Sequence, residues 1–123
     1  MSITFEAYRE LLSLEYPLFR KNFTAIYDRV RTAPLGVRAS NALGCSEICQ
    51  AVDLAAVFYF RRVLCLQRSA ATARLLKRYG FPAQLVIGVQ QLPFAAHAWV
   101  EMSGLVVNDK PYISDIYSVL TRC

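Results

Sequence analysis

Residues 65–89 read CLQRSAATARLLKRYGFPAQLVIGV, and the spacing of apolar side chains changes within this stretch. In its first part the apolar residues recur every three or four positions, as on one face of an amphipathic helix: Leu66, Ala70, Ala73 and Leu76. Gly80 can adopt the left-handed conformation that ends a helix, and Pro82 prevents its continuation. Beyond the proline, apolar residues alternate with others, as in a strand: Ala83, Leu85, Ile87 and Val89. The stretch predicts a helix over about residues 65–79, followed directly by a strand.

The segments on either side extend this pattern. Apolar spacing predicts helices over residues 3–15 and 18–31, and a third helix with these residues on one face: Cys45, Ile48, Cys49, Val52, Ala55, Ala56 and Tyr59. Two more short strands are expected at residues 97–101 and 105–109. Because helices come first and strands follow, we predict an α+β fold in which the helix that begins at Cys65 packs on a small antiparallel sheet.

The composition is that of one folded domain. A chain of 123 residues has no room for a second autonomous core, so we expect a single domain with a helical region at 1–60 and a core region at 61–123. Apolar residues make up 55% of the chain and charged residues 19%, which excludes intrinsic disorder. The mean hydropathy of +0.30 indicates a well-filled core or an apolar patch that a partner covers.

Nothing in the sequence predicts a membrane span or a signal peptide. The longest apolar run, residues 54–60, is far shorter than the roughly 20 residues that a span needs. Acidic residues interrupt the region where a signal peptide would be uncharged: Glu6, Glu10 and Glu15. We therefore expect a cytoplasmic protein.

The chain is basic, with 14 Lys and Arg against nine Asp and Glu. The cations are scattered along the sequence, whereas nucleic-acid binders usually concentrate them on one face with aromatic residues between them. We therefore expect no nucleic-acid partner. Scattered arginines suit a surface that binds acidic peptide or protein, or a face that is simply solvated.

Three residues have the types and positions of a catalytic set. Cys65 begins a helix, and a helix N-terminus stabilises a thiolate through its partial positive charge and free N–H groups. His97, the single histidine of the chain, lies on a strand and could take and return a proton. Asp109, at the end of the next strand, could orient the imidazole. Each residue also has a purely structural interpretation: a small core thiol, a structural histidine and a turn-forming aspartate.

The loop between the two strands decides whether His97 and Asp109 can meet. A three-residue loop at 102–104 sets them directly opposite each other, with Cβ atoms about 5 Å apart. A two-residue turn at 103–104 sets Asp109 opposite Ala98, on the other face of the sheet. We therefore predict the three-residue loop or an equivalent bulge. Asn108 is a rival orienting group, but strand alternation puts it on the face opposite Asp109.

The remaining cysteines and an isolated carboxylate support no second site. Cys45 and Cys49 lie four residues apart, but zinc would need two more ligands, so we expect buried thiols, no metal and no cofactor. Asp53 lies inside an apolar run, where we expect it to cap a helix or to pair with an arginine such as Arg61.

Several short motifs between residues 65 and 109 resemble the bacterial transglutaminase-like core domain of lasso-peptide leader peptidases. The segments that carry the resemblance are CLQRS (65–69), LL (75–76), Gly80, IGV (87–89), AHAWVE (96–101) and VND (107–109). The separations of 32 residues from Cys65 to His97 and 12 residues from His97 to Asp109 suit that family.

The resemblance implies a papain- and transglutaminase-type cysteine protease that removes the leader from a ribosomally made precursor peptide. Cys65 is then the nucleophile, His97 the general base and acid, Asp109 the orienting carboxylate, and the Cys65 backbone N–H an oxyanion donor. A separate cyclase would close the lasso ring afterwards. Some members carry a fused leader-binding domain. Since this chain leaves no length for one, we expect a separate leader-recognition protein, with region 1–60 docking that partner or the leader.

Two other classes of function stay open on the same residues. One is transfer of the acyl group to an amine, as in transglutaminases, because hydrolysis and transfer share the thioester. The other is a non-catalytic scaffold that binds the precursor and its partners. Trp99 is either a wall of the cleft or a core residue, and Arg68 either contacts the leader or faces solvent.

Overall fold

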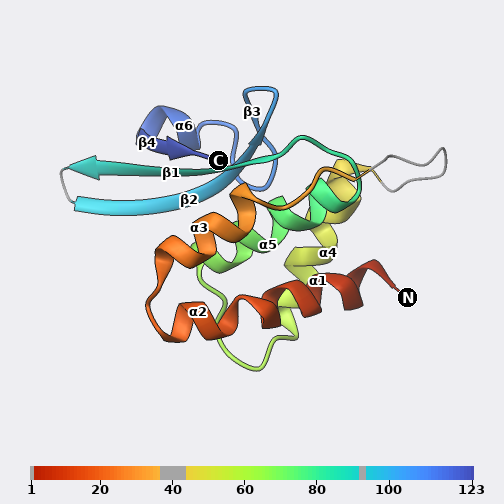
Figure 1. Ribbon diagram of the computed structural model, residues 1–123. Helices are drawn as coiled ribbons and strands as arrows, with labels where there is room; N and C mark the ends of the chain where they lie inside the picture. The colour runs from red at the N-terminus through yellow and green to blue at the C-terminus, as the bar shows by residue number, and fades with distance from the viewer. Residues whose placement is uncertain (1, 37–43, 92–93) are drawn as a thin grey trace.

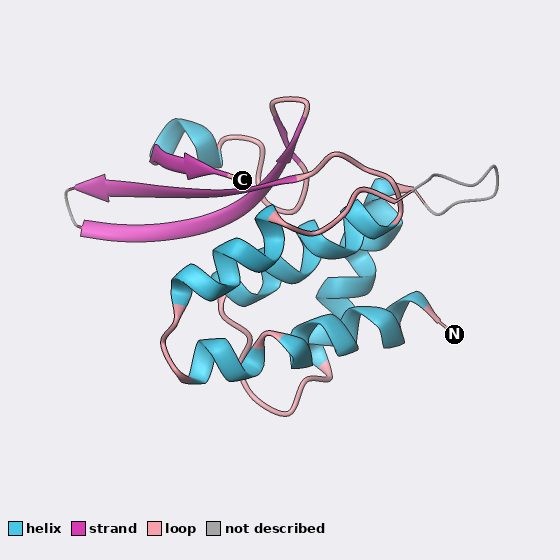
Figure 2. Cartoon of the chain, viewed as in Figure 1, coloured by secondary structure: helices cyan, strands magenta, loops and turns pink. Residues whose placement is uncertain are grey.

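The computed structural model describes residues 2–36, 44–91 and 94–123, which form a helical layer beneath a small sheet (Figures 1 and 2). The elements in chain order are α1 (Ile3–Ser13), α2 (Glu15–Phe19), α3 (Phe23–Arg31), α4 (Cys45–Val57), α5 (Cys65–Arg78), β1 (Gln84–Gln91), β2 (Phe94–Met102), β3 (Leu105–Val106), α6 (Ile113–Ile116) and β4 (Ser118–Arg122). The strands pair antiparallel in the order β3-β2-β1-β4. The predicted α+β fold is therefore confirmed. No helix in the described ranges is long and apolar enough to cross a bilayer.

The two N-terminal helices differ from the expected boundaries. The helix predicted over residues 18–31 is interrupted, because α2 ends at Phe19 and Lys21 adopts a left-handed backbone conformation with φ of 54°. Asn22 then starts α3, since its side chain accepts a hydrogen bond from the Ala25 backbone N–H at 3.1 Å. Polar capping at Asn22 thus breaks a segment whose apolar spacing alone looked continuous.

Helix α5 lies at the centre of the main core. Its buried residues pack against α1 and α4 and against the face of the sheet that carries Leu85 and Val100. Gly80, with φ of 90°, ends the helical region in the left-handed conformation that the sequence predicts. This packing fixes the N-terminus of α5, and with it Cys65, beside the sheet.

The opposite face of the sheet has a smaller core of its own. Val86 and Trp99 are paired across β1 and β2 and are covered by Ile113 of α6. Tyr117 and Val119 pack against the same cluster. The chain after Pro111 thus returns to the sheet as β4, a strand that the sequence pattern does not predict. His97 lies on this face, in register with Gly88.

The turn between β2 and β3 has two residues, so the predicted three-residue loop is wrong. Ser103 and Gly104 both have positive φ, 54° and 80°, and Met102 pairs directly with Leu105. Pairing ends almost at once, because β3 is only two residues long where a five-residue strand was expected. Residues 107–109 then bend, and this bend takes the place of the expected bulge in bringing Asp109 back towards β2.

Candidate active site

His97 and Asp109 form the closest polar contact of the site. The Nε2 of His97 lies 2.7 Å from Oδ2 of Asp109, and the other carboxylate oxygen accepts a hydrogen bond from the Lys110 backbone N–H at 2.8 Å. Burial pushes the pKa of Asp109 upward, but these two hydrogen bonds and the electrostatic attraction of His97 and Arg68 outweigh it and lower the pKa. The carboxylate is therefore held in its charged form. Nδ1 of His97 makes no hydrogen bond to a described residue.

The imidazole of His97 lies among aromatic rings. Its centroid is 5.4 Å from that of Tyr117 and 6.1 Å from that of Trp99, with both ring pairs close to parallel. Trp99 is fully buried, and its Nε1 donates to Glu101 Oε2 at 2.9 Å, so the structure makes it a core residue and not a wall of the cleft.

Gly88 makes this arrangement possible. A Cβ at this position would lie 2.6 Å from the Trp99 ring and 2.9 Å from the Tyr117 Cβ, both closer than normal van der Waals contact. Sequence reasoning assigned no role to Gly88 or to Tyr117. A glycine inside a strand is a signal of close approach, but only the structure identifies the rings that approach it.

Cys65 is the first residue of α5. Leu64 before it has extended backbone angles, and no side chain of the described residues caps the helix N-terminus. The first intrahelical hydrogen bond runs from the Arg68 N–H to the Leu64 carbonyl, so the N–H groups of the first turn remain available to an anion. The thiol is half-buried.

Cys65 lies between two cavities. The first, of about 300 Å³, is lined by both Cys65 and His97 and otherwise by apolar side chains: Phe23, Leu66, Ile87, Ala96 and Ala98. Within the described part of the chain, no hydrogen bond joins the Cys65 thiol to the imidazole. The structure therefore joins His97 to Asp109 directly and sets Cys65 at the same cavity as the histidine.

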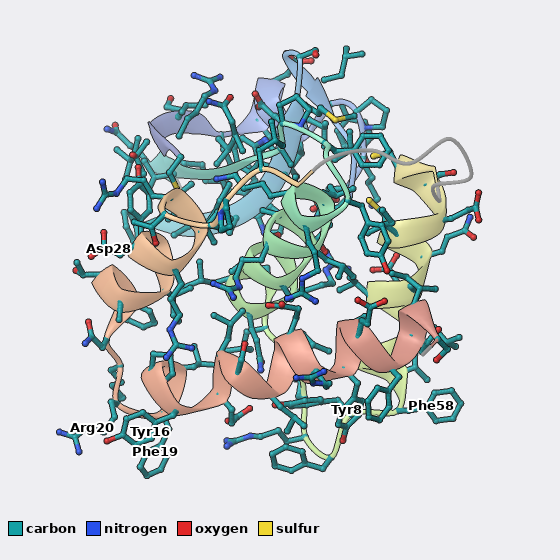
Figure 3. All side chains as sticks on the ribbon, turned by 45° about the vertical axis from the view of Figure 1, so that its right-hand side comes forward. Tyr8, Tyr16, Phe19, Arg20, Asp28 and Phe58 are labelled. Carbon is teal, nitrogen blue, oxygen red and sulfur yellow. The ribbon has the colours of Figure 1, made fainter. Side chains whose placement is uncertain are left out.

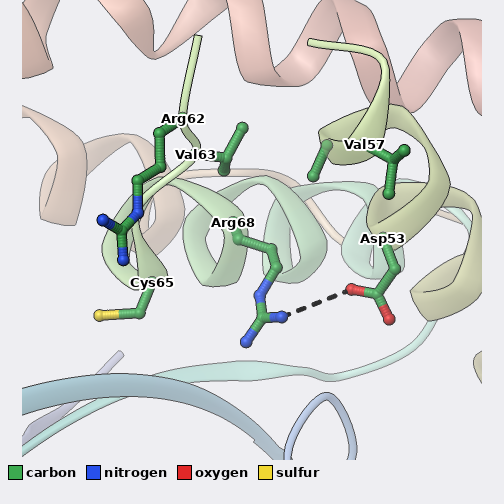
Figure 4. Close-up of a pocket in the computed structure, with 7 residues that line it drawn as sticks. Asp53, Val57, Arg62, Val63, Cys65 and Arg68 are labelled. Carbon is green, nitrogen blue, oxygen red and sulfur yellow. Dashed lines mark ion pairs between the residues drawn. The ribbon is translucent and has the colours of Figure 1, made fainter.

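The second cavity, of about 560 Å³, is lined by charged side chains as well as apolar ones and is shown in Figure 4. Arg68 lies in it with 31% of its side chain exposed, 3.7 Å from Asp53 Oδ1 and 4.0 Å from Asp109 Oδ2. Burial raises the pKa of Asp53, the charge of Arg68 opposes this rise, and the charge of Asp109 adds to it to a smaller extent. Asp53 thus pairs with an arginine, as expected, but the partner is Arg68, because Arg61 lies 3.0 Å from Glu15 instead.

Asn108, the rival orienting group, bonds elsewhere. Its Oδ1 accepts from the Val100 backbone N–H at 2.8 Å, and its Nδ2 donates to Ser69 Oγ at 3.1 Å. Ser69 in turn donates to the Ala98 carbonyl at 3.0 Å. This chain of bonds ties the bend at 107–109 to α5 and β2, so Asn108 positions the backbone next to Asp109.

The other cysteines line neither of the two cavities at Cys65. Burial and the neighbouring Cys45 thiol raise the pKa of Cys49 to about 12. Burial also raises the pKa of Cys123. Across residues 2–36, 44–91 and 94–123, no three His, Cys, Asp or Glu side chains gather into a group that could hold a metal ion.

Two comparisons with known proteins give a match. The model of the transglutaminase-like superfamily matches residues 10–122. The chain is also 46% identical over 58 residues to the microcin J25-processing protein McjB of Escherichia coli, a match that spans 47% of this chain and 28% of that protein. No solved structure gives a significant match. Since the superfamily model covers nearly the whole chain, this chain belongs to the transglutaminase-like superfamily.

Proposed function

We propose that this chain is a cysteine protease that removes the leader peptide from a ribosomally made lasso-peptide precursor. The observation that carries the proposal is the 2.7 Å contact between His97 and Asp109 beside a cavity that Cys65 also lines. Membership of the superfamily and the likeness to a microcin-processing protein support the same class of chemistry and substrate.

The mechanism starts with transfer of the Cys65 thiol proton to Nδ1 of His97. The thiolate attacks the scissile carbonyl carbon, and the Cys65 backbone N–H at the free end of α5 stabilises the oxyanion. As the C–N bond breaks, the imidazolium gives its proton to the leaving amine, and a thioester remains. Water, deprotonated by His97, then releases the leader carboxylate and restores the thiol.

Asp109 has two functions in this mechanism. Its charged carboxylate keeps Nε2 of His97 protonated, so that Nδ1 is the basic nitrogen, and it stabilises the imidazolium that forms. The apolar cavity beside Cys65 and His97 suits an uncharged side chain of the substrate next to the cleaved bond.

The pathway partners are part of the proposal. A separate leader-recognition protein would deliver the precursor, with the helical region at 1–60 as its docking region, and a cyclase would act on the new N-terminal amine. Acyl transfer to an amine is the second candidate, because the superfamily is named for that reaction and it shares the thioester.

Mass spectrometry of the reaction products tests the proposal. The full chain is incubated with a precursor peptide and the leader-recognition protein, in parallel with Cys65→Ala and the control variant Cys45→Ala. We expect a leader with a free carboxylate from the wild type and Cys45→Ala, and none from Cys65→Ala. Cleavage by Cys65→Ala would refute the assignment of Cys65 as the nucleophile. A new amide in place of the free carboxylate would show that the chain catalyses acyl transfer to an amine.

A further inference from the structure

A third cavity, of about 420 Å³, lies beside the candidate active site between α2, α3 and the segment that leads into α5. We call it the α2–α3 cavity. Its apolar lining residues are Leu18, Phe19, Phe23 and Leu64, and its charged lining residues are Glu15, Lys21, Arg61 and Arg62. Phe19, Phe23 and Leu64 are all more than half exposed, so this apolar surface is open to solvent.

The α2–α3 cavity shares a lining residue with each of the two cavities that Cys65 lines. Phe23 also lines the apolar cavity of Cys65 and His97, and Arg62 also lines the larger cavity of Cys65. Leu64, on the cavity wall, directly precedes Cys65 in the chain. A peptide seated with one bond at Cys65 can therefore extend into the α2–α3 cavity.

The charges of the cavity do not balance. Glu15, its one anion, is 3.0 Å from Arg61 and also accepts hydrogen bonds from Tyr59 Oη and Gln67 Nε2. The side chains of Lys21 and Arg62 have no carboxylate and no hydrogen-bond partner among the described residues. The cavity thus presents two uncompensated positive charges around an exposed apolar surface.

We propose that the α2–α3 cavity binds an acidic and apolar stretch of the substrate peptide, on one side of the bond at Cys65. The proposal rests on the proposed function, because the substrate must be a peptide that lies across Cys65. Apolar side chains would cover Phe19, Phe23 and Leu64, and a carboxylate would pair with Lys21 or Arg62.

The test uses two amidated hexapeptides with a dansyl label, LEFELQ and its uncharged counterpart LQFQLQ. Binding is followed by fluorescence anisotropy with the full chain carrying Cys65→Ala, so that no turnover disturbs the equilibrium. The acidic peptide should bind more tightly than its counterpart, and added salt should reduce the difference because it screens exposed charges.

Charge variants locate the binding site. Arg62→Gln and Lys21→Gln should each weaken binding of the acidic peptide by about two- to fivefold, as expected for partly exposed ion pairs, and leave the uncharged peptide unaffected. Arg20→Gln is the matched control, because it removes the same charge from an exposed residue that does not line the cavity. It should have little effect.

An apolar pair completes the design. Phe19 is 72% exposed and lines the cavity, whereas Phe58 is 70% exposed and lies at the far end of the helical layer (Figure 3). Phe19→Ser should weaken the binding of both peptides, whereas Phe58→Ser should weaken the binding of neither. Because both rings are exposed, neither variant should impair folding.

The outcomes separate this proposal from the proposed protease. Equal binding of the two peptides, or an Arg20→Gln effect as large as that of Arg62→Gln, would overturn the α2–α3 cavity as an acidic-peptide site even if precursor cleavage is observed. Self-association that Phe19→Ser abolishes, without peptide binding, would assign the cavity to a second copy and likewise overturn the proposal. If the peptides bind as expected but no Cys65-dependent cleavage is observed, the proposed protease activity is refuted, while the preference of the α2–α3 cavity for acidic peptide is upheld.

Discussion

Replacing Gly88 by alanine tests how the fold holds His97. The added Cβ would lie 2.6 Å from the Trp99 ring, whereas carbon atoms in good contact are about 3.5–4.0 Å apart. One or both rings beside His97 must move, and overpacking of this kind costs about 1–3 kcal/mol of stability. Because displacement of a catalytic group by about 1 Å can reduce the rate 100-fold, we expect precursor cleavage to fall by about 10- to 100-fold.

Gly104→Ala is the matched control for this effect. Gly104 has φ of 80° and open space at its Cβ position, so alanine there meets backbone strain of about 1–2 kcal/mol but no neighbouring atom. The two variants should therefore lose similar stability in urea unfolding, while Gly104→Ala keeps cleavage within about twofold of the wild type. Wild-type activity in folded Gly88→Ala, or an equal loss in Gly104→Ala, would refute the reasoning.

Four further predictions concern Asp109, Arg68 and the buried thiol of Cys49. Asp109→Asn should lower the rate of precursor cleavage by about 100-fold or more, which is a smaller loss than that of His97→Ala. Imidazole ¹⁵N NMR of this variant should show loss of the Nε2-protonated tautomer. Unchanged activity would mean that another residue orients His97. The pKa of Asp109 is lower in the folded chain than in the unfolded chain, where it is 3.8, so the charged carboxylate stabilises the fold above pH 3.8. This stabilisation is lost as the pH falls through the folded-state pKa. The difference in unfolding free energy between wild type and Asp109→Asn should therefore shrink in acid. Arg68→Gln should shift the acid limb of the pH–rate profile to higher pH, because it removes a positive charge beside Asp109. It should lower the rate by less than about fivefold, since this ion pair is partly exposed. Asp53→Asn should not shift the acid limb to higher pH. Cys49→Ala should keep full activity if it folds, because burial raises the pKa of its thiol to about 12; lost activity in a folded variant would give that thiol a role.

The change of apolar spacing near residue 80 was enough to predict the centre of the fold. It predicts that α5 ends just before Gly80 and that β1 starts just beyond Pro82, because both events depend on local backbone preferences. The breaks around α2 were missed for a related reason: the side chain of Asn22 competes with helix continuation, and apolar spacing does not record that competition.

The hairpin shows where local reasoning fails. Loops of two and three residues both fit a Ser-Gly pair, and the observed turn needs a positive φ at Ser103, which is uncommon for serine. His97 and Asp109 still meet, because the strand ends early and the chain bends, held by the hydrogen bonds of Asn108. Strand β4 and the Tyr117 ring over His97 depend on contacts between segments far apart in the chain, so no local pattern predicts them.

Selective alkylation of Cys65 is the most direct test of the candidate active site. The full chain is treated with a limiting dose of iodoacetamide, and peptide mass spectrometry measures the modified fraction of Cys45, Cys49, Cys65 and Cys123. Cys65 should react first, since it lies at the free N-terminus of α5 beside His97, whereas burial raises the thiol pKa of Cys49 and Cys123. His97→Ala should abolish the preference. Equal labelling of all four thiols, with and without precursor and leader-recognition protein, would contradict an activated Cys65 nucleophile.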